Sequence, residues 1–210
     1  MASKVEICNY ALQELGASFI TSLTEDTKNA RECNLRFDSV RRSLLRMSLW
    51  NFAIKRVDLS RETSTPAFNY SYQFALPSDF LKLVMTKNEE QHQSFAGATI
   101  NPLTTVQDIN TSYAIDKYRV EGKKLVSDSS EVSIIYVSDT ENTGEWDSLF
   151  TELFTRLLTA RIARKITGSA KESQIQMKIF EEELAFAESV DGQEGVFDKI
   201  QISTFLSTRH

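Results

Sequence analysis

Residues 30–50 read Ala30-Arg-Glu-Cys-Asn-Leu-Arg-Phe-Asp-Ser-Val-Arg-Arg-Ser-Leu-Leu-Arg-Met-Ser-Leu-Trp50, and they give the clearest structural pattern in the chain. Apolar residues recur there at alternating spacings of three and four, as in a helix that buries one face. Asp26 or Thr27 can cap the start. We therefore predict a helix of roughly 36 Å at 1.5 Å per residue, ending near Trp50. Its apolar seam consists of Ala30, Cys33, Phe37, Val40, Leu44 and Met47.

Three arginines of this helix, Arg31, Arg42 and Arg46, project together on the side opposite the seam. Three interpretations stay open for this arginine stripe. It is a solvated helix face, a nucleic-acid contact, or a contact between subunits in which the arginines meet acidic residues of an adjacent copy. The formal net charge of −5 gives no general reason to bind nucleic acid. The acidic candidates for the subunit contact are Glu181 and Glu182, with Glu172, Glu183 and Glu188 on the same predicted helix.

Helical spacing predicts three more helices. Ser3 and Glu6 form a capping box that starts a helix over about 4–15, and Gly16 can end it. A helix after Gly144 has apolar residues around much of its circumference, so we expect it to be central and to contact several neighbours. Gly168 ends that helix. A second capping box, Ser169 and Glu172, opens a fourth helix that we expect to end at Gly192 and Gly195.

Between residues 52 and 139 the spacing of apolar residues changes to the alternation of strands. We expect strands near 51–57, 70–75, 80–85 and 132–137. Residues 118–126 read as a hairpin that turns at Gly122, and residues 88–112 read as a loop. This part predicts a small antiparallel β unit.

Together these elements predict an α+β fold: a four-helix bundle with an inserted small antiparallel β unit and an extended C-terminal arm. The expected organisation is residues 1–51 for the first half of the bundle, 52–139 for the β insert, 140–192 for the second half of the bundle, and 193–210 for the arm. The 210 residues, 41% of them hydrophobic, provide enough apolar material for a core.

The sequence offers no pattern typical of catalysis. It has no glycine-rich phosphate loop, no His-Glu-x-x-His and no Gly-x-Ser-x-Gly motif, so we expect no enzyme and no cofactor. Cys8 and Cys33 both fall on apolar helix faces and read as free core thiols. Together with the distant His92 and His210 they do not form a zinc motif, so we expect no metal. The N-terminus lacks a secretory signal, and no apolar run is long enough for a membrane span.

The last 15 residues are unusually apolar for a chain terminus. Ile200-Gln-Ile202 alternates, which suits strand addition to a neighbour's sheet. We expect an arm that orders on assembly and contacts a neighbouring subunit or another partner, and the alternative is that it packs on its own bundle. The candidate contacts are Phe197, Ile200, Ile202, Phe205 and Leu206.

Several strings, in order, resemble the tail tubular protein A family, the head-to-tail adaptors of short-tailed phages. Tyr72-Gln-Phe-Ala-Leu-Pro-Ser-Asp-Phe-Leu81 is similar to the family's Phe-Ala-Leu-Pro-x-Asp-Phe-Leu string. The resemblance covers about residues 3–195. One departure is Ser48-Leu49, where the family often has His-Pro, and the C-terminal tail matches least well. The other matching strings are Arg42–Ala53, Tyr118–Leu125, Asp147–Phe154, Ala160–Ala163 and Ile166–Ser169.

This resemblance implies a structural virion protein. Members of the family form a dodecameric ring between the portal protein and the tail nozzle protein. DNA passes through the shared channel without sequence-specific binding during genome ejection, and no membrane is involved. The expected location is the head-tail junction of a virion assembled in the host cytoplasm. The alternative is a non-virion helical interaction protein or an assembly chaperone.

Overall fold

The computed structural model describes residues 2–86 and 118–194. It contains four α-helices, α1 (Lys4–Glu14), α2 (Lys28–Met47), α5 (Ser148–Thr167) and α6 (Ala170–Glu194). Six strands lie between α2 and α5: β1 (Ile54–Asp58), β2 (Tyr72–Ala75), β3 (Phe80–Thr86), β4 (Tyr118–Glu121), β5 (Lys124–Ser127) and β6 (Ser133–Ser138). Two short 3-10 turns, η1 (Asn51–Ala53) and η3 (Thr143–Glu145), stand before β1 and before α5.

The described chain divides into two compact units. Of the described residues, the helical unit takes 2–44, 50–52 and 142–194, and the β unit takes 45–49, 53–86 and 118–141. The chain therefore starts in the helical unit, builds the β unit, and returns to the helical unit for α5 and α6. Residues 193–210 were expected to form an arm, and from Gly195 onward they lie outside the described residues.

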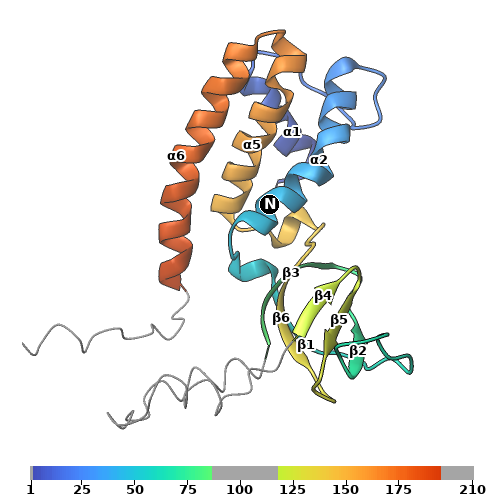
Figure 1. Ribbon diagram of the computed structural model, residues 1–210. Coiled ribbons are helices and arrows are strands. Elements are labelled where there is room, and N and C mark those ends of the chain that lie inside the picture. The colour runs from blue at the N-terminus through green and yellow to red at the C-terminus, as the bar shows by residue number, and fades with distance from the viewer. Residues whose placement is uncertain (1, 87–117, 195–210) are drawn as a thin grey trace, which may run out of the picture. The chain divides into compact units, whose positions relative to one another are not determined.

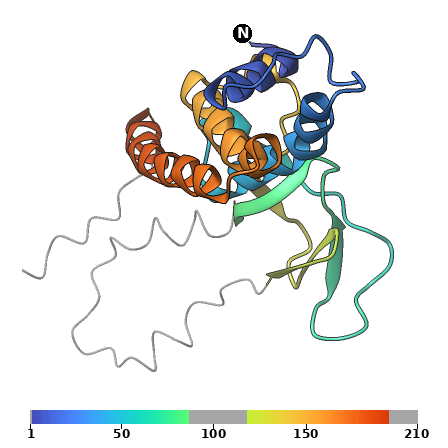
Figure 2. The ribbon, with the colours of Figure 1, turned by 90° about the horizontal axis from the view of Figure 1, so that it is seen from above.

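α5 is the central helix of the helical unit. α6 lies alongside it and α1 packs against it. Figures 1 and 2 show α6 and α2 on opposite sides of α5, with α1 on a further side. Nine residues of α5 are buried, so the expectation of a central helix with several neighbours is confirmed. Six aromatic rings fill the space around its N-terminal half: Phe37, Trp50, Phe52, Trp146, Phe150 and Phe154.

The helix ends follow the predicted signals at most positions. Ser3 and Glu6 form both hydrogen bonds of the capping box at α1. Gly16 and Gly168 have φ values of +64° and +76°, the left-handed conformation that a residue without Cβ adopts at little cost. At α6, Ser169 accepts the hydrogen bond from the Glu172 amide, but the Glu172 carboxylate accepts from Gln176 instead of returning to Ser169.

One helix end differs from the prediction. α2 ends at Met47, not at Trp50, and Met47 is 45% exposed although it belongs to the predicted seam. Beyond Met47 the chain turns, so that the Trp50 indole Nε1 donates to the Leu44 carbonyl. α6 runs through Gly192 to Glu194, since one glycine in a long helix costs only about 1 kcal/mol relative to alanine, and Gly195, the second predicted stop, lies outside the described residues.

The β unit contains two antiparallel sheets of three strands each, in the orders β1-β6-β3 and β2-β5-β4. β6 is central in the first sheet, and five of its six residues are buried. β5 is central in the second sheet, and Gly122 turns the β4–β5 hairpin with φ +61°, as expected. The predicted loop over 88–112 lies outside the described residues. The core of this unit comprises Phe74, Leu125, Val132, Ile134 and Tyr136.

The expected four-helix bundle with a small β insert is wrong. The described part of the chain is a mixed α and β structure with four helices and two three-stranded antiparallel sheets. Helical periodicity locates a buried face but does not say which helices share it, and here the helices are arranged around α5. Strand alternation likewise does not fix the number of sheets, and the β residues form a core of their own.

Candidate interaction surfaces

The arginine stripe of α2 is exposed but is not a continuous row of unpaired cations. Arg31 forms an ion pair with Asp26 at 2.8 Å, and both side chains are largely exposed. Arg42 is exposed. Arg46 donates through Nη1 to the Leu81 carbonyl of β3. Within the stripe, Arg46 is therefore hydrogen-bonded to strand β3 and Arg31 forms a surface ion pair. Arg42 lies between them along the helix.

Arg41 of α2, next to Val40 of the predicted seam, is completely buried. Its Nη1 contacts Asp38 Oδ1 at 2.6 Å, one helical turn away. A buried guanidinium is stabilised only when carboxylates or carbonyls replace its water. Helical spacing places Arg41 at the edge of the seam, about 100° from Arg42, but spacing alone does not show that other elements cover this edge completely.

The acidic face predicted on α6 is exposed at Glu181 and Glu182. Glu182 pairs weakly with Lys178 of the same helix at 3.8 Å. Glu183 instead turns toward the interior of the helical unit, where its Oε1 lies 3.3 Å from Nε of Arg156. Only part of the Glu181–Glu183 cluster therefore faces solvent.

Arg156 of α5 joins three helices through ion pairs that were not predicted from the sequence. Its Nη1 lies 2.9 Å from Glu14 Oε2 of α1, in addition to the contact with Glu183 of α6. The Arg156 side chain is only 25% exposed, so solvent screens this pairing less than the pairing of Arg31. Because the two carboxylates come from distant parts of the chain, no local spacing could have predicted the group.

Exposed apolar side chains mark both units. In the helical unit Leu35 of α2 is 71% exposed and Ile175 of α6 is 44% exposed. In the β unit Phe68 is 76% exposed. Large apolar side chains at such positions are candidates for contacts with other molecules. The other exposed apolar residues are Tyr10, Phe19, Met47 and Val120.

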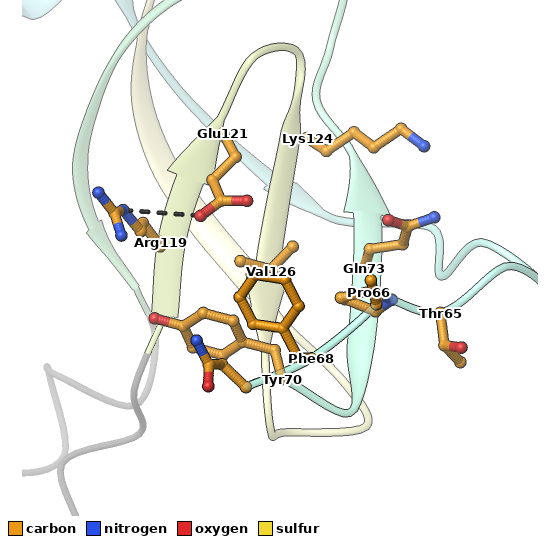
Figure 3. A pocket seen from close by; sticks show the side chains of 11 residues that line it. Thr65, Pro66, Phe68, Tyr70, Gln73, Arg119, Glu121, Lys124 and Val126 are labelled. Atoms are coloured by element: carbon orange, nitrogen blue, oxygen red, sulfur yellow. Dashed lines mark ion pairs between the residues drawn. The ribbon is translucent and has the colours of Figure 1, made fainter.

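An open cleft of about 520 Å³ lies in the β unit between the loop 65–70 and one face of the second sheet (Figure 3). Asn69 has φ +70° in this loop, between Phe68 and Tyr70. On the sheet side the charges pair within the protein. Arg119 lies 3.6 Å from Glu121, and Lys124 lies 2.7 Å from Glu62.

The paired charges leave the cleft without a dominant sign. The hydrogen bond from Lys124 holds the pKa of Glu62 below its usual range, so Glu62 stays ionised and paired. The cleft is lined by both polar and apolar residues, and its charged side chains are already paired, so it does not favour one class of ligand. We therefore base no function on it.

The β unit also contains a hydrogen-bonded carboxylate at the start of β3. Asp79 accepts hydrogen bonds from Lys55 Nζ at 2.7 Å and from the Tyr136 hydroxyl at 3.0 Å. Partial burial opposes ionisation of Asp79, but these two bonds outweigh it and lower its pKa. Burial and the nearby carboxylate raise the pKa of Tyr136 to about 12. This arrangement joins three strands and has the features of a structural link.

Cys8 of α1 and Cys33 of α2 are free and fully buried, as predicted. A hydrogen bond between the two thiols, together with burial, raises the pKa of Cys8 far above its usual value, so the thiol stays protonated. Among residues 2–86 and 118–194 no group of three or more His, Cys, Asp or Glu side chains is placed to hold a metal ion. The expected contacts at Phe197, Ile200, Ile202, Phe205 and Leu206 lie outside the described residues, as do His92 and His210.

No helix in the described part of the chain has the length and hydropathy needed to span a membrane. In comparisons with known proteins, the chain matches no protein-family model and no curated protein sequence.

Proposed function

We propose that this protein is a structural virion component: a head-to-tail adaptor of the tail tubular protein A type in a short-tailed phage. In this role copies of the chain form a dodecameric ring between the portal protein and the tail nozzle protein. DNA passes through the shared channel without sequence-specific binding. The observation that carries the proposal is the ordered set of strings that resemble this family.

Those strings lie at positions that determine the fold. Trp50-Asn-Phe-Ala53 forms the turn between α2 and β1, and residues 72–81 run from β2 through a turn into β3. Gly122 of the Val-Glu-Gly-Lys string turns the β4–β5 hairpin. Junctions restrict backbone conformation more than ordinary apolar positions do. A shared order of junction strings therefore supports a shared fold, and through it the adaptor role.

Strings that resemble the family also lie at both ends of α5. Asp147 caps the N-terminus by accepting a hydrogen bond from the Leu149 amide at 2.8 Å. Gly168 ends the helix in the left-handed conformation. Both residues belong to strings that resemble the family. The correspondence thus spans the helical unit and the β unit.

In this proposal the arginine stripe of α2 and the acidic face of α6 lie at contacts between adjacent copies. Head-to-tail contacts between identical subunits need two different surfaces on each subunit. The stripe and the acidic face, on helices at opposite sides of α5, meet that requirement. The C-terminal residues Phe197, Ile200, Ile202, Phe205 and Leu206 are proposed to contact the portal or the adjacent copy.

The test is assembly of the full chain. Its mass in solution is measured by mass photometry, alone and with purified portal rings of the same phage, and the particles are imaged by negative-stain electron microscopy. We expect rings of twelve copies, free or seated on the portal. A strict monomer that does not bind portal rings would overturn the proposal.

A further inference from the structure

An exposed leucine lies within the arginine stripe of α2. At about 100° per residue, Leu35 projects about 20° from Arg42 and about 40° from Arg31. The Leu35 side chain is 71% exposed, although it stands in the middle of a long helix. Arg31, Leu35 and Arg42 thus form one surface, which we call the Leu35 face, with an apolar centre between two arginines, of which Arg31 is paired with Asp26.

α6 carries a similar surface with the opposite charge. Ile175 is 44% exposed, and Glu182, seven residues later, projects about 20° from it. The Glu182 side chain is 69% exposed, and its only ion pair among the described residues is the weak contact with Lys178 at 3.8 Å. We call Ile175 and Glu182 the Ile175 face.

The two faces have matching spacing. Leu35 and Arg42 are seven residues apart, as are Ile175 and Glu182, and seven residues correspond to about 10.5 Å along a helix. When two such helices lie parallel with Leu35 opposite Ile175, Arg42 comes level with Glu182. The antiparallel arrangement would instead bring Lys28, seven residues before Leu35, level with Glu182, so the response to Arg42→Glu and its rescue by Glu182→Arg distinguish the two arrangements.

We propose that the Leu35 face of one copy docks on the Ile175 face of the next copy, with α2 and α6 parallel. Leu35 and Ile175 exclude water at the centre, and Arg42 pairs with Glu182 beside them. A second copy is the partner that fits because both complementary faces belong to the same chain. They lie on helices at opposite sides of α5, so each copy offers one face to each neighbour (Figure 1).

This inference rests on the proposed ring-forming function and names a contact within the ring. The charged and the apolar residues of the contact have different roles in binding. The exposed ion pair steers the encounter and sets the register, whereas the apolar pair slows dissociation once water is excluded. Self-association is therefore expected to weaken as the salt concentration rises.

The experiment measures self-association of the full chain, alone and on portal rings, by sedimentation velocity and mass photometry. Leu35→Ser, Arg42→Glu and Glu182→Arg are each expected to weaken self-association by about tenfold or more. The double variant Arg42→Glu/Glu182→Arg is expected to restore it, because the pair is complementary again with its charges exchanged. Circular dichroism checks that each variant is folded, as the exposure of all three side chains predicts.

Matched controls separate this contact from a general effect of charge. Arg164→Glu on α5 and Glu131→Arg in the β unit change exposed residues outside both faces and should leave self-association unchanged. If the parent chain assembles and the three single variants assemble equally well, or if the double variant fails to recover, the proposed contact is wrong while the ring function stands. If the parent assembles neither alone nor on portal rings, both proposals are overturned.

Discussion

In the helical unit six aromatic rings meet around α5, whereas in the β unit a carboxylate just before β3 accepts hydrogen bonds from side chains of β1 and β6. The centroid of the Phe154 ring lies 4.7 Å from that of Phe37 and 4.9 Å from that of Trp146. The corresponding feature of the β unit is Asp79, which is bonded to Lys55 and Tyr136. Both units bury apolar residues, but the helical unit adds a cluster of aromatic rings, whereas the β unit adds a hydrogen-bonded carboxylate.

This difference predicts different responses to perturbation. Aromatic packing depends on volume and shape and hardly on pH. The Asp79 link depends on an ionised carboxylate, so it responds to acid. Both tryptophans, Trp50 and Trp146, belong to the helical unit, so tryptophan fluorescence reports on that unit. Hydrogen exchange of peptides from β1, β3 and β6 reports on the β unit.

The largest effect is expected for Phe154→Ala. Phe154 is fully buried and contacts three other rings, so its removal leaves a cavity that α5 cannot close. We expect a loss of about 3–5 kcal/mol in the free energy of unfolding, as for other buried phenylalanines. Urea unfolding followed by tryptophan fluorescence measures it. The control Phe19→Ala, at an exposed position of the same unit, should stay within about 0.5 kcal/mol of the parent. A loss below about 1 kcal/mol for Phe154→Ala would mean that the aromatic cluster is not the core of this unit.

Much of this cluster was foreseeable from the sequence. Phe37 belongs to a seam with strict helical spacing, and Trp146 opens an apolar pattern that continues through α5. The helices and strands of both units were predicted because a buried face imposes a period that local sequence retains. The caps at Ser3 and Gly168 were predicted because each satisfies a local backbone requirement.

Contacts between distant segments were not foreseeable in the same way. The pairing of strands into two sheets, the burial of Arg41, and the group of Arg156 with Glu14 and Glu183 all depend on which elements meet in space. Residues one position apart can differ completely in this respect: Glu182 is exposed, while Glu183 pairs with Arg156. The sequence predicted an acidic face on α6 but not which carboxylates remain available for a partner.

A smaller effect, confined to the β unit, is expected for Asp79→Asn. The folded-state pKa of Asp79 is lowered, so its ionised form stabilises the β unit above the ordinary carboxyl pKa of about 3.9. That contribution is lost as the pH falls through the lowered value. At pH 7 we expect a loss of about 1–2 kcal/mol, since one charged hydrogen-bonding group is replaced by a neutral amide.

Hydrogen exchange of the β1 and β6 peptides, measured between pH 7 and pH 3 with correction for intrinsic rates, tests this prediction. The β unit of the variant should lose less of its remaining stability in acid than that of the parent. Glu131→Gln removes an exposed carboxylate and serves as the control. If Asp79→Asn matches the parent at pH 7 and in acid alike, the β unit does not depend on this link.

The smallest effect, about 1 kcal/mol or less, is expected for Ser3→Ala in the helical unit. The Ser3 hydroxyl accepts the Glu6 amide, and the Glu6 carboxylate accepts the Ser3 amide, so the variant leaves the Glu6 amide without its partner. Because α1 packs on α5 through buried residues, the cap need not hold the whole helix, and the loss should appear first as faster exchange of the amides in the first turn of α1. Hydrogen exchange of residues 2–14 measures this, with Ser18→Ala, beyond the helix, as the control. The opposite outcome would be a urea midpoint, followed by tryptophan fluorescence, that Ser3→Ala lowers as strongly as Phe154→Ala does. In that case ring packing would not be the main source of stability of the helical unit.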